Sequence, residues 1–121
     1  MNLKRARQIL KSLADDTRLR IVNLLRNREL AVSDICEVLR KKQPNISKHL
    51  TRLRLTGLVV DRRSGSNVYY FLDKSEDKEH THFLDTVLKG LTDIEVFRKD
   101  EEVLSKLRKP KKTSLKKTVK K

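Results

Sequence analysis

The sequence predicts a mainly α-helical domain that carries one β hairpin. Most apolar residues recur at helical spacing, one stretch near the middle of the chain alternates with a period of two, and turn-forming residues are scarce. Three Gly, two Pro and no Trp in 121 residues argue against a β sandwich or barrel. This length fits one domain, and the lack of any apolar run near 18 residues excludes a membrane span.

Three helices are expected in the first 40 residues. The first is amphipathic, with apolar residues at Leu3, Ala6, Ile9, Leu10 and Leu13. Asp15 and Asp16 suit the positive end of a helix dipole, so a second helix begins there. Residues 27–29 make a break, and a short third helix covers about residues 32–39.

A fourth helix and a hairpin follow. Pro44 suits a first helical turn, and Gly57 has the position of a helix C-cap. The period then changes to two over residues 59–63 and 67–72, on either side of a Ser-Gly-Ser turn. This pattern predicts a β hairpin.

After the hairpin, apolar residues over 83–94 return to helical spacing, and a weaker helical stretch covers 96–107. A short helix, a tight turn, a second helix and a hairpin together make a winged helix-turn-helix. The chain is therefore divided into a winged helix-turn-helix domain at 1–94, a C-terminal helical extension at 95–108 and a disordered Lys-rich tail at 109–121.

The positive charge is concentrated in two segments. The chain has 30 Lys and Arg against 16 Asp and Glu, a net charge of +14. Residues 38–72 hold eight basic residues and one acid, and residues 109–121 hold seven Lys and no acid. Disorder is expected in the second segment because it has too little apolar surface to offset the entropy of ordering. The charge points to a polyanionic partner, most commonly nucleic acid.

The fourth helix is the candidate recognition helix. With Ile46, Leu50 and Leu53 turned toward the core, its opposite face and flanks point outward. The candidate DNA contacts on this helix are Gln43, Pro44, Asn45, Ser47, Lys48, His49, Thr51 and Arg52. Asn can pair with adenine and Arg with guanine in the major groove. The alternative is a plain solvated helix, but residues 38–60 contain no acid, which favours groove contact.

Further contacts are expected on either side of this helix. The residues before it should touch the DNA backbone: Arg40, Lys41 and Lys42. The wing should lie over phosphate or enter the minor groove through Arg62, Arg63, Ser66 and Asn67. The alternative is a hairpin whose charge serves solubility. Tyr69 and Tyr70 point to opposite faces of the strand, so at most one faces the core, and both are expected to pack rather than stack on bases.

Several blocks resemble bacterial ArsR/SmtB-type transcriptional repressors. The family motif LADPTRLRIL is similar to residues 13–21, LADDTRLRI, with Asp16 in place of the usual Pro. The motif ELxVxxL is similar to residues 29–35, ELAVSDI. The motif QPxVSxHL is similar to residues 43–50, QPNISKHL, and parts of residues 62–72 match the family's wing.

The resemblance covers about residues 3–90 and implies a homodimer that represses transcription until an effector releases it from operator DNA. It also implies that the first and last core helices form the dimer interface. The residues agree, because a three-helix core with a wing cannot bury the broad apolar stripes of both helices. The candidate interface residues are Leu3, Leu10, Leu84, Val87, Leu88 and Leu91.

The ligands of the family's two metal sites are missing. The resemblance places a two-cysteine site in the third helix, where this chain has Ala31 and Ser33. At the second site, in the last core helix, it has Lys74, Glu76, Val87 and Gly90. No metal or other cofactor is therefore predicted. His80 and His82 point about 200° apart on a helix and are expected to be exposed, with a metal site across the dimer as the alternative.

Cys36 stands where a sulfur-sensing branch of the family carries one of two reactive cysteines. The second would lie near Lys89 here, so an intrachain disulfide switch is not expected. One interpretation is a buried Cys that packs as a small hydrophobe. The other is a thiol-responsive or redox-responsive repressor, acting through a modified Cys36 or an intersubunit bridge. A single Cys also fits a reducing cytoplasm, and the charged N-terminus is not expected to be a secretory signal.

The sequence therefore predicts a dimeric repressor that binds double-stranded DNA by sequence. The alternative is an architectural or nonspecific nucleic-acid-binding protein in which the Lys-rich tail does much of the binding. An enzyme is not expected, because no phosphate-binding Gly loop or nucleophile–His–acid motif is present. The expected partners are operator DNA and a second copy of the chain. The sequence assigns no effector and no membrane partner.

Overall fold

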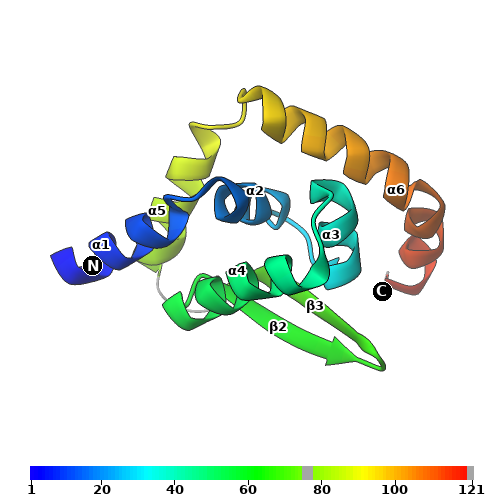
Figure 1. The fold of residues 1–121 in the computed structure, drawn as a ribbon, viewed down its shortest axis with the longest axis horizontal. Helices are drawn as coiled ribbons and strands as arrows, with labels where there is room; N and C mark the ends of the chain where they lie inside the picture. The colour runs from blue at the N-terminus through cyan, green and yellow to red at the C-terminus, as the bar shows by residue number, and fades with distance from the viewer. Residues whose placement is uncertain (75–77, 120–121) are drawn as a thin grey trace.

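The computed structural model describes the backbone of residues 1–74 and 78–119 and the side chains of residues 1–74 and 80–107. The elements are α1 (Leu3–Leu13), α2 (Asp16–Leu24), β1 (Leu30–Ala31), α3 (Val32–Leu39), α4 (Gln43–Thr56), β2 (Val59–Ser64), β3 (Asn67–Leu72), α5 (Lys78–Lys89) and α6 (Glu95–Val119) (Figure 1). The helix-turn-helix is α3 and α4, and the hairpin after it is the wing. Within the described residues, no helix combines the length and apolar character needed to cross a membrane.

The helix ends follow local sequence signals. The Asp15 carboxylate caps α2 by accepting a hydrogen bond from the Arg18 backbone N–H at 3.0 Å, so the predicted start of this helix is confirmed. α4 has Pro44 in its first turn. It ends at Gly57, whose φ of 85° is a left-handed conformation that glycine adopts without strain.

β3 is the central strand of a three-stranded antiparallel sheet, with β2 on one side and β1 on the other. The β2–β3 hairpin is the predicted wing. β1 was not predicted, because two residues cannot display a period of two. Its Leu30 and Ala31 pair with Tyr70 and Tyr69, which ties the base of the wing to the start of α3. Tyr70 packs against the core, in agreement with the expectation that at most one of the two tyrosines does so.

The hydrophobic core fixes which way α4 faces. Ile46, Leu50 and Leu53, the stripe predicted to point inward, are at most 1% exposed. They pack in one cluster with buried leucines of α2 and α5 and with the root of the wing. Burying this stripe leaves the opposite side of α4 on the surface.

The last core helix begins and ends earlier than predicted. The helix expected over 83–94 corresponds to α5, which covers Lys78–Lys89, and a turn separates it from α6. Gly90 follows the last helical residue directly. Glycine loses more backbone entropy than other residues when it is ordered, so Gly90 favours the end of the helix at this position.

The C-terminal boundary also differs. Disorder was predicted from residue 109 onward, but α6 continues as helical backbone to Val119. Most residues of this segment are Lys or other residues compatible with a helix, and Pro110 is its one strong helix breaker. The lack of apolar residues bears on packing and does not by itself exclude a helical backbone, so disorder of this segment stays a prediction. Residues 120–121 of the predicted tail lie outside the described residues.

α6 packs on α2 and α3 (Figure 1). Its inward face buries Phe97, Asp100 and Leu104, each 3% exposed. The Asp100 carboxylate accepts two hydrogen bonds from the Arg20 guanidinium, at 3.0 and 2.8 Å. The first part of α6 is thus packed into the folded domain. It contacts α2 and α3, the two helices that also pack against α4.

Candidate nucleic-acid interface

A tight turn of basic residues joins α3 to α4. Arg40, at the end of α3, has a left-handed backbone with φ of 57°, and its N–H and that of Lys41 both donate to the carbonyl of Cys36. Arg40 and Lys42 are exposed and Lys41 is half-buried. The residues predicted to contact the DNA backbone therefore lie at the entry to α4.

The outer face of α4 is exposed. Six of the predicted contacts are exposed: Gln43, Pro44, Asn45, Lys48, Thr51 and Arg52. Ser47, on the flank, is half-buried. Leu55 extends the same face and is 75% exposed. Its outward position was not predicted, although its spacing of seven residues from Lys48 is the signal that could have revealed it.

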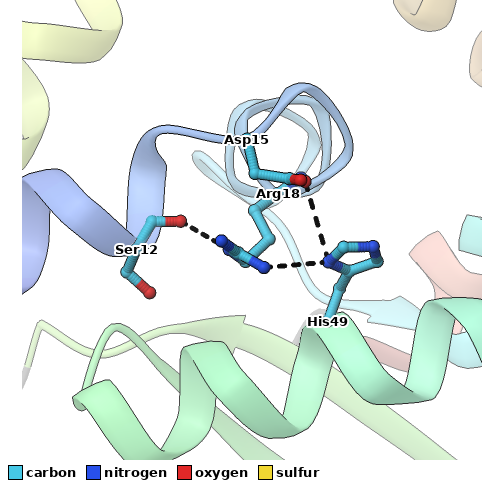
Figure 2. Close-up of polar contacts among 4 residues, drawn as sticks. All are labelled: Ser12, Asp15, Arg18 and His49. Carbon is cyan, nitrogen blue, oxygen red and sulfur yellow. Dashed lines mark hydrogen bonds and ion pairs between the residues drawn. The ribbon is translucent and has the colours of Figure 1, made fainter.

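A polar cluster between α4 and the first two helices joins them (Figure 2). The Arg18 guanidinium donates through Nε to the carbonyl of Ser12 at 2.6 Å and through Nη1 to Nδ1 of His49 at 3.2 Å. Oδ2 of Asp15 lies 3.7 Å from the same His49 nitrogen. His49 therefore points toward α2 and ties α4 to it, and the predicted contact of this residue with DNA stays a prediction.

Burial lowers the pKa of His49 below its ordinary value of 6.5. The Asp15 carboxylate acts in the opposite direction, whereas the positive charges of Arg18, Lys48 and Lys41 lower the pKa further. The neutral ring suits the contact, because Nδ1 must keep its lone pair to accept the hydrogen bond from Arg18. Protonation would replace that acceptor with a second positive charge.

We expect the protein to lose stability as the pH falls below about 6.5, the ordinary pKa of histidine. The unfolded chain binds a proton at His49 more readily than the folded chain does, so the contribution is complete above this pH and is lost below it. Urea denaturation at pH 7.5 and pH 5.5 measures the difference. In His49→Gln the difference should shrink, and an unchanged difference would assign it to other groups.

An ion pair joins the wing to the residue before β1. Arg62 is hydrogen-bonded to the Glu29 carboxylate, and its guanidinium carbon lies 5.0 Å from the centre of the Tyr69 ring. Glu29 precedes β1, so its proximity to the wing could not be inferred before the β1–β3 pairing was seen. The other predicted wing residues, Arg63, Ser66 and Asn67, are exposed around the hairpin tip. To contact a phosphate, Arg62 would have to break its ion pair with Glu29 or bind both groups at once.

Known regulatory proteins resemble this chain in sequence and in fold. The sequence profile described as "Bacterial regulatory protein, arsR family" matches residues 15–60, from the cap of α2 into β2. The arsenic resistance transcriptional regulator ArsR1 of Pseudomonas putida is 43% identical over 86 residues, which are 70% of this chain and 64% of that protein. The chain thus spans less than two thirds of this relative.

The transcriptional repressor SdpR of Bacillus subtilis is 30% identical over 87 residues, which are 71% of this chain and 97% of SdpR. The chain belongs to the arsR family of bacterial regulatory proteins. A structure from Mycobacterium bovis, described as the homodimeric winged helix-turn-helix DNA-binding domain of a possible ArsR-family regulator, is 29% identical. It has a TM-score of 0.61 and covers 70% of this chain and 76% of its own. The winged helix-turn-helix predicted from the sequence is confirmed.

The candidate dimer residues of this arsR-family chain fall into two groups. Leu3 and Leu10 on α1 are 79% and 51% exposed and have no cover within the described residues. Leu84 and Leu88 on α5 are only 4% and 0% exposed, because they pack into the chain's own core, and this placement differs from the prediction. The remaining candidates are half-buried: Val87 and Leu91.

The candidate residues for metal binding or redox sensing in this arsR-family member are His80, His82 and Cys36. His82 is exposed, but the expectation that His80 is exposed too was wrong: it is 6% exposed, and its Nδ1 lies 3.4 Å from Nη2 of Arg5. In the described part of the chain, no three His, Cys, Asp or Glu side chains are grouped to hold a metal ion. Cys36 is half-buried, and burial raises the pKa of its thiol. This favours the unreactive protonated form and the packing interpretation.

Proposed function

We propose that this arsR-family protein is a homodimeric transcriptional regulator that binds double-stranded DNA by sequence and represses from an operator. The observation that carries the proposal is the outer face of α4, which is exposed and free of acid and follows directly on the basic turn at residues 40–42. A rigid helix that presents amide, hydroxyl and cationic side chains on one face suits the major groove. The name of SdpR as a transcriptional repressor supports repression. A regulator of this kind would work in the cytoplasm.

Different parts of the proposed interface would contact the bases and the backbone of the DNA. Asn45 is exposed in the first turn of α4, where an amide can pair with adenine. Lys48 and the basic turn before α4 would meet phosphate, which fixes the position of the helix but carries no sequence information. Arg63 and Asn67 at the wing tip would contact backbone or minor groove beyond the helix.

Lys48→Ala and Asn45→Ala are expected to weaken DNA binding in different ways. Lys48→Ala should weaken binding to a selected duplex and to a scrambled duplex by similar factors and reduce the salt slope by about one per contact. Asn45→Ala should cost roughly 1–3 kcal/mol on the selected duplex alone. Fluorescence anisotropy titrations at several salt concentrations measure both. Unchanged affinity in both variants would mean that this face does not enter the groove.

The second candidate function is nonspecific nucleic-acid binding. It is favoured by the seven Lys of residues 109–121, since such charge binds DNA by counterion release without regard to sequence. Wild-type protein would then bind selected and scrambled duplexes equally. Deleting residues 109–121 would remove most of the affinity for both. Under the main proposal the deletion lowers both affinities but leaves the preference for the selected duplex.

The homodimer would use the uncovered apolar edge of α1. We expect Leu3→Asp combined with Leu10→Asp to yield a folded monomer, because both side chains are exposed in the single chain. Sedimentation velocity at micromolar concentration gives the mass, and circular dichroism checks the fold. A dimer mass in the double variant would place the interface elsewhere. Substituting Leu84 or Leu88 instead would disturb the core and could not separate dimerisation from folding.

A further inference from the structure

A cleft of about 320 Å³ lies between α1 and the second half of α4. Figure 1 shows these two helices next to each other, and they are in contact. The cleft is lined by Arg5, Gln8, Lys11, Arg52, Leu55 and Thr56. Half of these six residues are cations, and the six include no acid. The α1 residues that line the cleft lie outside the sequence motifs that resemble the family.

The floor of the cleft is fixed by contacts between the two helices. Nη1 of Arg5 donates to the backbone carbonyl of Thr56 at 2.6 Å, and the hydroxyls of Ser12 and Thr56 are 3.2 Å apart. A Cβ on Gly57 would lie 3.2 Å from Nη2 of Arg5, so the glycine permits the close approach of the guanidinium. A cation is thus held at the C-terminal end of α4 with its position already set before a ligand arrives.

The rim of the cleft is open and adjoins the recognition face. Gln8, Lys11 and Arg52 are exposed, so amide, ammonium and guanidinium donors surround the opening. Arg52 belongs to both surfaces, since it lies on the outer side of α4 and also lines the cleft. The apolar edge of α1 is elsewhere, because Gln8 and Leu10 are two residues apart and point about 200° from each other on a helix.

We propose that this cleft binds a backbone phosphate of the DNA whose major groove α4 enters. The inference rests on the proposed DNA-binding function and adds α1 to the interface, outside the helix-turn-helix and the wing. The donors match a phosphate, which offers only acceptor oxygens, and the exposed guanidinium fork of Arg52 matches its geometry, while Arg5 adds a fixed positive charge. The cleft also assigns Arg52 to the backbone rather than to guanine, and so to affinity rather than sequence preference.

Three single variants of the full chain test the assignment: Lys11→Gln, Gln8→Glu and the control Arg7→Gln. Arg7 is an exposed cation on the same helix that does not line the cleft. All three side chains are exposed, so the variants should fold, and thermal melts verify this. Affinity is measured from 50 to 300 mM salt for a duplex selected from a random pool and for a scrambled duplex of equal length.

Lys11→Gln is expected to weaken binding to both duplexes alike and to reduce the salt slope by about 0.9 per bound protomer, the value for one phosphate. Gln8→Glu should weaken both more strongly by repulsion, and Arg7→Gln should leave the slope near that of the wild type. Equal slopes for the Lys11 and Arg7 variants would overturn the proposal. Loss of preference for the selected duplex would also overturn it, because a phosphate contact carries none.

A free phosphate ion offers the same acceptor oxygens as a backbone phosphate of DNA. If inorganic phosphate raises the melting temperature of the wild type but not of Lys11→Gln, while the DNA salt slopes of the two agree, the cleft is a free-phosphate site and the proposal is wrong. A wild type that binds no duplex would overturn the proposed function together with this inference. A wild type that loses affinity through Lys48→Ala but not through Lys11→Gln or Gln8→Glu would overturn the inference alone.

Discussion

Replacing Arg20 by Ala is expected to lower the free energy of unfolding by roughly 3–5 kcal/mol, the range for breaking a buried ion pair on one side. The Asp100 side chain is 4% exposed and the Arg20 side chain 22%, so the variant would leave the Asp100 side chain buried without its Arg20 hydrogen bonds. The hydrogen bond to Asp100 raises the pKa of Arg20, so the contact favours the charged guanidinium. Urea denaturation followed by circular dichroism measures the loss.

The second ion pair of α6 provides a matched control. Arg28 and Glu101 are also joined by two hydrogen bonds, at 3.2 and 2.9 Å, but their side chains are 30% and 44% exposed. Arg28→Ala should therefore cost only about 0–1 kcal/mol. Combining Arg20→Met with Asp100→Leu should recover most of the stability, since no buried charge remains. Equal losses in the two Arg→Ala variants would mean that burial of Asp100 is not the cause.

Arg18→Ala is expected to lower the free energy of unfolding by roughly 1.5–3 kcal/mol, the range for a hydrogen bond made by a charged group. Arg18 links Ser12 to His49 and thereby connects the end of α1 with α4. The same variant should weaken DNA binding about tenfold if holding α4 at its angle then costs about 1.4 kcal/mol. Denaturation and anisotropy titration on one preparation measure both effects.

Arg18→Lys separates geometry from charge. Lysine keeps the positive charge but lacks the planar fork that reaches the Ser12 carbonyl and His49 together. We therefore expect it to behave like Arg18→Ala in both measurements. Full recovery by lysine would show that the charge beside Asp15, rather than the bridge, supports α4.

The order of helices and the wing could be predicted because they follow from local patterns. The Asp15 cap, Pro44 and Gly57 each mark a helix end through interactions within a few residues. β1 could not be predicted, since its two residues become a strand only by pairing with β3. The extent of α6 differs from the prediction, because the scarcity of apolar residues measures the gain from packing rather than the helix preference of the backbone.

The recognition face was predicted because one helix with a buried stripe has only one outer side. The contacts that orient this face were not, because they join residues far apart in the sequence. His49 lies 31 residues from Arg18, and Arg5 lies 51 residues from Thr56. The spacing of apolar residues within one helix does not indicate which other helix will pack against it. The α1 side of the cleft was missed for the same reason.

The contact between Arg20 and Asp100 spans 80 residues and has a consequence for biosynthesis. A ribosome adding about 5–20 residues per second would take roughly 4–16 seconds to make that stretch. During this time the side of α2 that α6 covers has no partner in the nascent chain, and closing so long a loop is a late and slow step. Of the described elements, α6 should therefore be the last to dock on a newly made copy of the chain.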